Sequence, residues 1–290
     1  MRIARFTQDG RTRLGLVVAD GVVDLARGDR GPADIDALLA QGPESVDALR
    51  VHAQASPDLA LDAVRLETPV PRPSKVLAIG LNYADHIAES GMPRPQHQLW
   101  FNKQIDCVCG PSDTIELPAV ATERVDYEAE LVVVIGRRCR HVPAERAAEV
   151  ILGYTCGNDV STRDWQMRSQ TMTLGKSFPT HGPIGPWIVT PEAFGDPQDA
   201  AIRCRVNGEL RQHSSTAEMI FSVAEQIAHL SAAFPLNPGD LLFTGTPHGV
   251  GGAMDPPAFL RAGDQVSVEI DGIGALTNTV GLETLRTRID

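Results

Sequence analysis

Glycine and proline residues divide this sequence into short apolar segments along its whole length. There are 26 Gly and 21 Pro among 290 residues, and they do not gather in one low-complexity block. Because both residues interrupt helices and mark turns, this spacing favours many short strands joined by turns. With 42% hydrophobic and 22% charged residues, the chain can bury a core of its own. A β-rich fold with some helix is therefore expected.

The first 70 residues predict a small N-terminal domain. Three apolar runs separated by Asp-Gly pairs indicate a β-meander; they cover residues 2–6, 13–18 and 22–25. Apolar residues at helical spacing follow between 33 and 66. The proline-rich segment 68–73 cannot continue a helix or complete a strand ladder, because each proline lacks an N–H. We place a boundary there, between domains 1–70 and 71–290.

Strands outnumber helices beyond this boundary. Buried-type strands are predicted at 75–79, 125–135, 184–189, 202–206, 241–244 and 266–270. Helical patterns are predicted at 144–151, from near Asp159 onward, and at 216–233.

The charge and the cysteines limit the classes of partner and compartment. A formal net charge of −11 argues against a general affinity for nucleic acid or an anionic membrane. No apolar stretch is long enough to cross a membrane, and no signal-peptide pattern is present. The five cysteines form no C-x-x-C pair and are expected to be reduced thiols. We therefore expect a cytoplasmic protein that binds neither nucleic acid nor membrane.

The segment 125–135 combines acidic and apolar residues. It reads Val-Asp-Tyr-Glu-Ala-Glu-Leu-Val-Val-Val-Ile, so in a strand Asp126, Glu128 and Glu130 point to one face. Glu128 and Glu130 would lie roughly 6.6 Å apart at the backbone, close enough to converge on one cation. The alternative is a solvent-facing edge strand whose acidic face is hydrated.

Asp159, in Gly-Asn-Asp-Val-Ser, is a candidate third carboxylate ligand. It lies where a strand is expected to end and a helix to begin, so an ordinary helix N-cap is the alternative. Ligation by two Glu and one Asp would select a hard cation, Mg²⁺ or Mn²⁺.

His86 and Glu89 follow a buried strand and a glycine, in Asn-Tyr-Ala-Asp-His-Ile-Ala-Glu. If a helical turn forms there, the i, i+3 spacing places both side chains on one face. The carboxylate can then orient the imidazole and raise its basicity, as a general base that activates water requires. The alternative is a surface His beside a surface Glu.

Two further groups suit an anionic substrate. Arg163 and Gln166 follow Asp159 at i+4 and i+7, which predicts one shared helical face; the alternative is an ordinary Asp–Arg helix pair. Lys176 lies in a Gly-Lys-Ser triplet, but Gln170 stands where a P-loop needs glycine. Nucleotide binding is therefore rejected.

In this order, the motifs resemble the fumarylacetoacetate hydrolase family, in the form of a bacterial member with a small N-terminal domain. The matching segments are 80–89, 126–131, 153–166, 175–178, 238–247 and 263–270. The resemblance implies an α+β, β-rich fold, a mixed β-sandwich roll with a small N-terminal α/β domain, and a homodimer.

The resemblance also implies a role for nine residues. It implies that Mg²⁺ or Mn²⁺ is held by Glu128, Glu130 and Asp159. It implies catalytic roles for His86, Glu89 and Lys176, and substrate contacts for Arg163, Gln166 and Thr246. The chain departs from the family pattern at Pro179 and His248, two positions that could shape the pocket.

The expected function is hydrolysis of a C–C bond in a 2,4-dioxo acid of the acylpyruvate type, giving pyruvate and a carboxylic acid. The substrate partner is thus a small 2-oxo or 2,4-dioxo acid. Decarboxylation of a 2-oxo acid and isomerisation of a 2-hydroxy-diene-dioate are alternatives on the same site, because both also pass through an enolate. A silent binding protein is a further alternative, against which His86, Glu89 and Lys176 argue.

Overall fold

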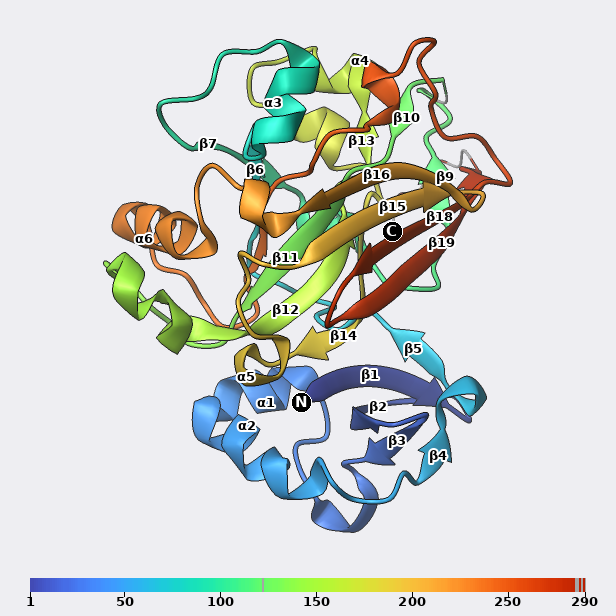
Figure 1. Cartoon of the computed structure of the whole chain (residues 1–290). Coiled ribbons are helices and arrows are strands. Elements are labelled where there is room, and N and C mark those ends of the chain that lie inside the picture. Colours follow the sequence, from blue (N-terminus) through green and yellow to red (C-terminus); the bar gives the residue numbers. More distant parts are fainter. Residues whose placement is uncertain (122, 285–286, 288, 290) are drawn as a thin grey trace.

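The expected meander forms at the N-terminus of the computed structural model, which describes residues 1–121, 123–284, 287 and 289 (Figure 1). Its elements are β1 (Arg2–Gln8), β2 (Arg11–Val18), β3 (Gly21–Asp24), α1 (Ile35–Gln41), α2 (Pro43–Ala48), β4 (Leu59–Ala60) and β5 (Arg65–Glu67). Asp9 and Gly10 both have positive φ and connect β1 to β2, as an Asp-Gly hairpin turn requires. The second turn lies one residue earlier than predicted, because Gly21 already pairs with Val18.

The N-terminal strands share one 12-stranded sheet with the rest of the chain. Its other strands are β6 (Val76–Gly80), β7 (Leu99–Lys103), β8 (Val108–Cys109), β11 (Ala129–Ile135), β12 (Ile151–Asn158), β14 (Gly182–Val189) and β17 (Leu241–Phe243). The order along the sheet is β4-β3-β2-β1-β14-β12-β11-β17-β6-β7, and the antiparallel pair β1–β14 joins the two parts. The domain boundary near residue 70 stays a prediction.

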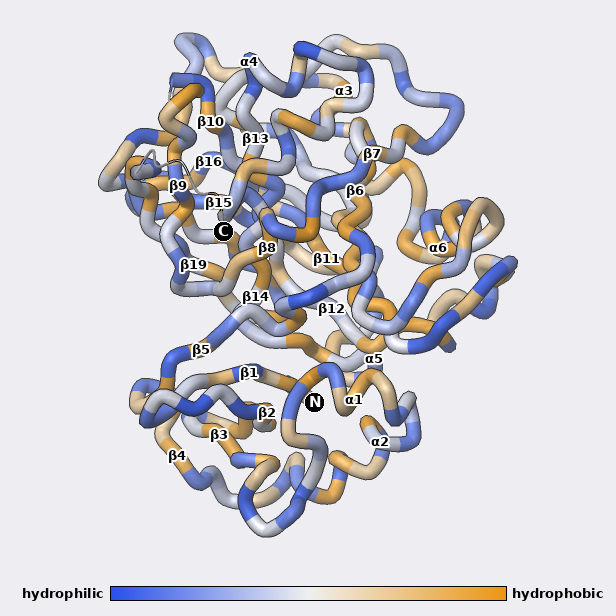
Figure 2. The backbone as a smooth tube through the Cα atoms, turned by 180° about the vertical axis from the view of Figure 1, so that it is seen from behind, coloured by the Kyte–Doolittle hydropathy of each residue, from blue (hydrophilic) through white to orange (hydrophobic). Residues whose placement is uncertain are grey.

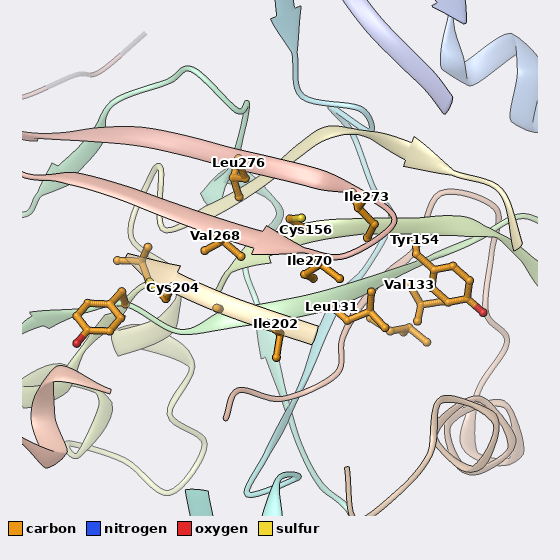
Figure 3. Packing of buried hydrophobic residues seen from close by; sticks show 14 of the residues in the cluster. Leu131, Val133, Tyr154, Cys156, Ile202, Cys204, Val268, Ile270, Ile273 and Leu276 are labelled. Atoms are coloured by element: carbon orange, nitrogen blue, oxygen red, sulfur yellow. The ribbon is translucent and has the colours of Figure 1, made fainter. Parts of the chain in front are cut away.

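A second sheet of five strands packs on the first and completes the predicted sandwich. Its order is β16 (Glu209–Ser215), β15 (Ala201–Val206), β18 (Gln265–Ile270), β19 (Gly274–Leu282) and β9 (Ile115–Leu117). Figure 3 shows Leu131 and Cys156 of the first sheet packed with Ile202, Val268 and Ile270 of the second. This confirms the α+β, β-rich class.

The helices are short and lie outside the sandwich (Figure 1). They are α3 (Ala84–Ser90), α4 (Arg163–Gln166), α5 (Pro191–Phe194) and α6 (Val223–Ala233). The helix predicted at 216–233 begins only at Val223, because Ser222 and Glu225 form a capping box there. The segment predicted as a helix at 144–151 is a 3₁₀-helix, Ala144–Val150. Among the described residues, no helix is long and apolar enough to span a membrane.

The predicted strand 125–135 is interrupted, and this break shapes the site. β10 (Val125–Asp126) pairs with β13 (Ser161–Thr162), whereas β11 begins at Ala129 in the centre of the large sheet. Between them, the N–H of Glu128 donates to the side chain of Asn158 at 2.9 Å. Figure 2 shows hydrophobic residues on the inner strands and a mostly hydrophilic connection between α3 and β7.

β12 was expected only as a strand that ends before Asp159, with no bounds of its own, because its glycines weaken a strand signal. Close packing nevertheless explains the glycine at position 157, because a Cβ there would lie 2.4 Å from Val132 and 2.8 Å from Phe243.

Candidate active site

Three buried carboxylates meet where β11 begins and β12 ends. The register pairs Glu130 with Gly157, so the chain leaving β12 brings Asp159 beside the start of β11. One carboxylate oxygen from each of Glu128, Glu130 and Asp159 lies within 4.8 Å of the other two. None of these residues is more than 6% exposed. The alternative of a solvent-facing edge strand is therefore wrong.

Two buried lysines and one arginine oppose this negative charge. Lys176 Nζ lies 2.8 Å from both Glu128 Oε2 and Asp159 Oδ2. Lys103 Nζ lies 2.5 Å from Asp159 Oδ1, and Arg163 Nη1 lies 2.6 Å from Glu128 Oε1. Burial alone would raise the pKa of Glu128, but Lys176 and Arg163 outweigh it and lower that pKa to about 2. Glu128 is therefore ionised.

Glu130 has no cationic partner among the residues that the structure describes. The backbone N–H of Gly245 donates to its Oε2 at 2.7 Å. Burial, and then the charges of Asp159 and Glu128, raise the pKa of Glu130 well above its ordinary value. A divalent cation at the centre of the three carboxylates would remove this conflict, and hard cations prefer oxygen ligands alone. The residues present therefore fit Mg²⁺ or Mn²⁺.

Asp126 fixes the guanidinium of Arg163. Its carboxylate accepts hydrogen bonds from Arg163 Nε at 2.9 Å and Nη2 at 2.7 Å, and from the backbone of residues 251 and 252. Arg163 begins α4 and donates to Gln166 Oε1 at 3.0 Å. The prediction that Asp159 shares this helix is wrong. After Asp159 the chain first forms β13, which pairs with β10, and α4 begins only at Arg163.

His86 and Glu89 form a hydrogen-bonded pair on α3, as their spacing predicts. His86 Nδ1 lies 3.1 Å from Glu89 Oε2. The other carboxylate oxygen accepts from the N–H of Gly249 at 2.8 Å, and Ser214 donates to Asp85 on the same helix at 2.5 Å. The two side chains are 17% and 21% exposed, so the pair is partly accessible to solvent.

A cavity of about 610 Å³ brings most of the predicted residues together. Six of the nine line it: His86, Glu128, Arg163, Gln166, Lys176 and Thr246. The remaining three, Glu89, Glu130 and Asp159, do not line it but are adjacent to residues that do. An imidazole, two cations and the Glu128 carboxylate thus face one space, and this arrangement can bind an anion and transfer a proton.

The sequence alone left three contributing residues without a role: Lys103, Asp126 and Gln212. Lys103 shares a strand face with buried Phe101, and this alternation is a signal that could have found it. Gln212 donates to Thr246 Oγ1 at 2.8 Å and accepts from the backbone of Ala129 at 2.9 Å. No local pattern identifies Gln212.

Pro179, His181 and His248 are not among the described residues that line the cavity. His181 is fully buried, and its Nε2 lies 2.9 Å from the carbonyl oxygen of Glu116, so Nε2 carries the hydrogen. Burial lowers the pKa of His181 to about 3. His248 Nε2 lies 3.1 Å from the carbonyl oxygen of His213.

The model of the fumarylacetoacetate (FAA) hydrolase C-terminal family matches residues 75–281. The chain belongs to this family. The match spans both the carboxylate cluster and the α3 dyad, and it confirms the resemblance that the ordered motifs indicate.

Three similar family members carry three different activities. The mitochondrial oxaloacetate tautomerase fahd2 of Xenopus laevis is 40% identical over 288 residues, covering 97% of this chain and 90% of that protein. A maleylpyruvate hydrolase from a Sphingobium species, solved with manganese(II) and pyruvate, is 32% identical with a TM-score of 0.81. A 5-carboxymethyl-2-hydroxymuconate delta-isomerase from Mycobacterium smegmatis is 36% identical with a TM-score of 0.79. Both structures cover 98% of this chain and 100% of their own. The family is thus one of enzymes.

Lys176→Met is expected to raise the affinity for Mn²⁺ about tenfold, or about 1.4 kcal/mol. The Lys176 ammonium bridges Glu128 and Asp159 and therefore competes with a cation for their oxygens. Calorimetric titration of the metal-free protein measures this change. Lys75→Met is the matched control, because Lys75 pairs with the buried Asp240 at 2.7 Å; it should lower stability without changing Mn²⁺ affinity. Weaker Mn²⁺ binding by Lys176→Met would contradict the competition.

His181→Gln is expected to make the free energy of unfolding depend less on pH in the acid range. The pKa of His181 is about 3 in the fold and about 6.5 in the unfolded chain. The unfolded state therefore takes up a proton that the folded state does not, and stability falls as pH drops from about 6.5 toward 3. The contribution of His181 to the change in the free energy of unfolding should approach about 1.4 kcal/mol per pH unit. Urea unfolding between about pH 7 and 5 measures it, and equal slopes for both proteins would refute the assignment.

Proposed function

We propose that this chain is a divalent-metal-dependent hydrolase that cleaves the C–C bond of an acylpyruvate to pyruvate and a carboxylic acid. The observation that carries the proposal is the shared cavity, in which the His86 imidazole faces the same space as Glu128, Lys176 and Arg163. A base, a charge-stabilising ammonium and an anion-binding guanidinium are the parts that such a cleavage needs.

Glu128, Glu130 and Asp159 would hold Mg²⁺ or Mn²⁺. When bound, such an ion supplies Lewis acidity toward the oxygen atoms of a 2-oxo acid. Arg163 and Gln166, which line the same cavity, would bind the substrate carboxylate, since a guanidinium suits that group. Asp126 holds Arg163 in place for this role.

His86 would act as the general base. Its Nδ1 faces Glu89, so Nδ1 carries the hydrogen and Nε2 is left free to accept one. Nε2 removes a proton from water, and the oxygen attacks the 4-carbonyl carbon. The bond between C3 and C4 then breaks, the acyl group leaves as a carboxylic acid, and the electron pair stays with the pyruvate enolate. Lys176 would stabilise that charge, and C3 is finally protonated to give pyruvate.

Tautomerisation of oxaloacetate is a second candidate, favoured by the name of the Xenopus laevis relative. His86 would then take a proton from the substrate rather than from water, and no bond between carbon atoms would break. The two candidates differ in their products.

Purified protein with Mn²⁺ is expected to convert an acylpyruvate to pyruvate and a second acid in equal amounts. Proton NMR of the reaction mixture measures both products. His86→Ala should lower kcat at least about 100-fold, because it removes the base. His229→Ala, an exposed histidine on α6, is the control and should retain full rate. Interconversion of the keto and enol forms of oxaloacetate without any cleavage of acylpyruvates would reject hydrolysis in favour of tautomerisation.

A further inference from the structure

The cavity is lined by a polar group and an apolar group of side chains. The polar group includes the residues assigned to metal, base and carboxylate binding. The apolar group, called here the apolar wall, is formed largely by Ile79, Leu81, Met92, Leu99, Met167 and Met172. The remaining polar lining there, Ser90, Ser169 and Gln170, is uncharged. A substrate whose 2-oxo acid group binds the polar residues would therefore place its other end against apolar side chains.

Methionine is concentrated in this wall. Three of the six methionines of the chain line the cavity. Met167 is 81% exposed and Met92 is 52% exposed, so both lie toward the solvent. Methionine side chains are unbranched and adapt to flexible apolar ligands, and such exposed apolar groups beside a cavity often mark a binding surface.

No cation among the described residues of this wall is available for a second carboxylate. Besides His86, the cationic lining residues are Arg163 and Lys176; both contact buried carboxylates, and the proposed function already assigns both to the 2-oxo acid group of the substrate. Arg168 lies over the ring of Trp165, 4.0 Å from its centroid, and does not line the cavity. Arg94, near Met92 in the sequence, is exposed and does not line it either.

We infer that the chain prefers a monocarboxylic 2,4-dioxo acid with a straight apolar acyl chain over a dicarboxylic one. This inference rests on the proposed function and names its substrate class. A second carboxylate would lose water without gaining a partner, which is unfavourable, whereas each methylene buried against the apolar wall is favourable. The preference separates this chain from its relatives named for oxaloacetate and maleylpyruvate, which are dicarboxylates.

The test compares kcat/KM for straight-chain acylpyruvates of increasing length with a 2,4-dioxo diacid of matching length. We expect a rise of about fourfold per added methylene and a diacid at least about 100-fold poorer than its apolar counterpart. A diacid turned over faster than the matching alkyl substrate would overturn the inference while leaving the hydrolase proposal intact.

Met167→Lys adds a cation to the apolar wall at a position that is exposed enough to tolerate it. It should raise kcat/KM for the diacid about tenfold relative to the alkyl substrate, by supplying the missing charge partner. Leu174→Lys is the matched control, because Leu174 is 57% exposed but does not line the cavity. An equal effect of both variants would overturn the inference.

Binding of uncleavable ligands separates this inference from the proposed function. In the presence of Mn²⁺, calorimetry compares a straight-chain 2-oxo acid with a 2-oxo diacid of the same length. Tighter binding of the alkyl ligand supports the apolar preference even if no acylpyruvate is cleaved, in which case the hydrolase proposal alone fails. Tighter binding of the diacid overturns the preference.

Discussion

Charge balance in a buried site holds the functional region of this protein together. Four carboxylates and three cationic side chains meet where β10 and β12 end and β11 begins; they are Asp126, Glu128, Glu130, Asp159, Lys103, Arg163 and Lys176. Such groups cannot be buried one at a time, because an unpaired buried charge is very costly. The cluster is left with one negative charge in excess, and Glu130 is the member without a cationic partner among the described residues. A divalent cation would reverse the sign of the cluster and make it suitable for an anionic substrate.

The sandwich supplies the rigid frame for this cluster, and α3 supplies the base from outside it. The fully buried β11 fixes Glu130, and its pairing with β12 sets the position of Asp159. Glu89 accepts a hydrogen bond from Gly249 and Asp85 accepts one from Ser214 of β16, so α3 is held with the His86 imidazole facing the cavity that Glu128, Arg163 and Lys176 also line. Base and cluster therefore belong to separate elements.

Local patterns predicted the parts of the site that depend on local geometry. Alternation along 125–135 indicated the paired glutamates, and i, i+3 spacing indicated His86 with Glu89. The partners that come from distant parts of the chain were not predictable in this way: Lys103 meets Asp159 across 56 residues of sequence. The helix predicted from Asp159 failed for the same reason, because the pairing of β13 with β10 overrides the local helical pattern. The ordered motifs of the family predicted more of the fold than hydrophobic periodicity did. One reason is that β12 contains glycines, which interrupt a periodic strand pattern.

Mn²⁺ binding by Glu130→Gln, compared with the wild type by calorimetry and thermal unfolding, tests the metal site most directly. The wild type should bind one Mn²⁺ per chain. The variant should bind at least about 100-fold more weakly, since even the loss of a group that only supports a ligand costs about 10–100-fold. Without metal, the variant should unfold at the same or a higher temperature, because it removes a buried charge that has no cationic partner. Equal Mn²⁺ affinity of the two proteins would contradict the assignment of Glu130 to a cation site.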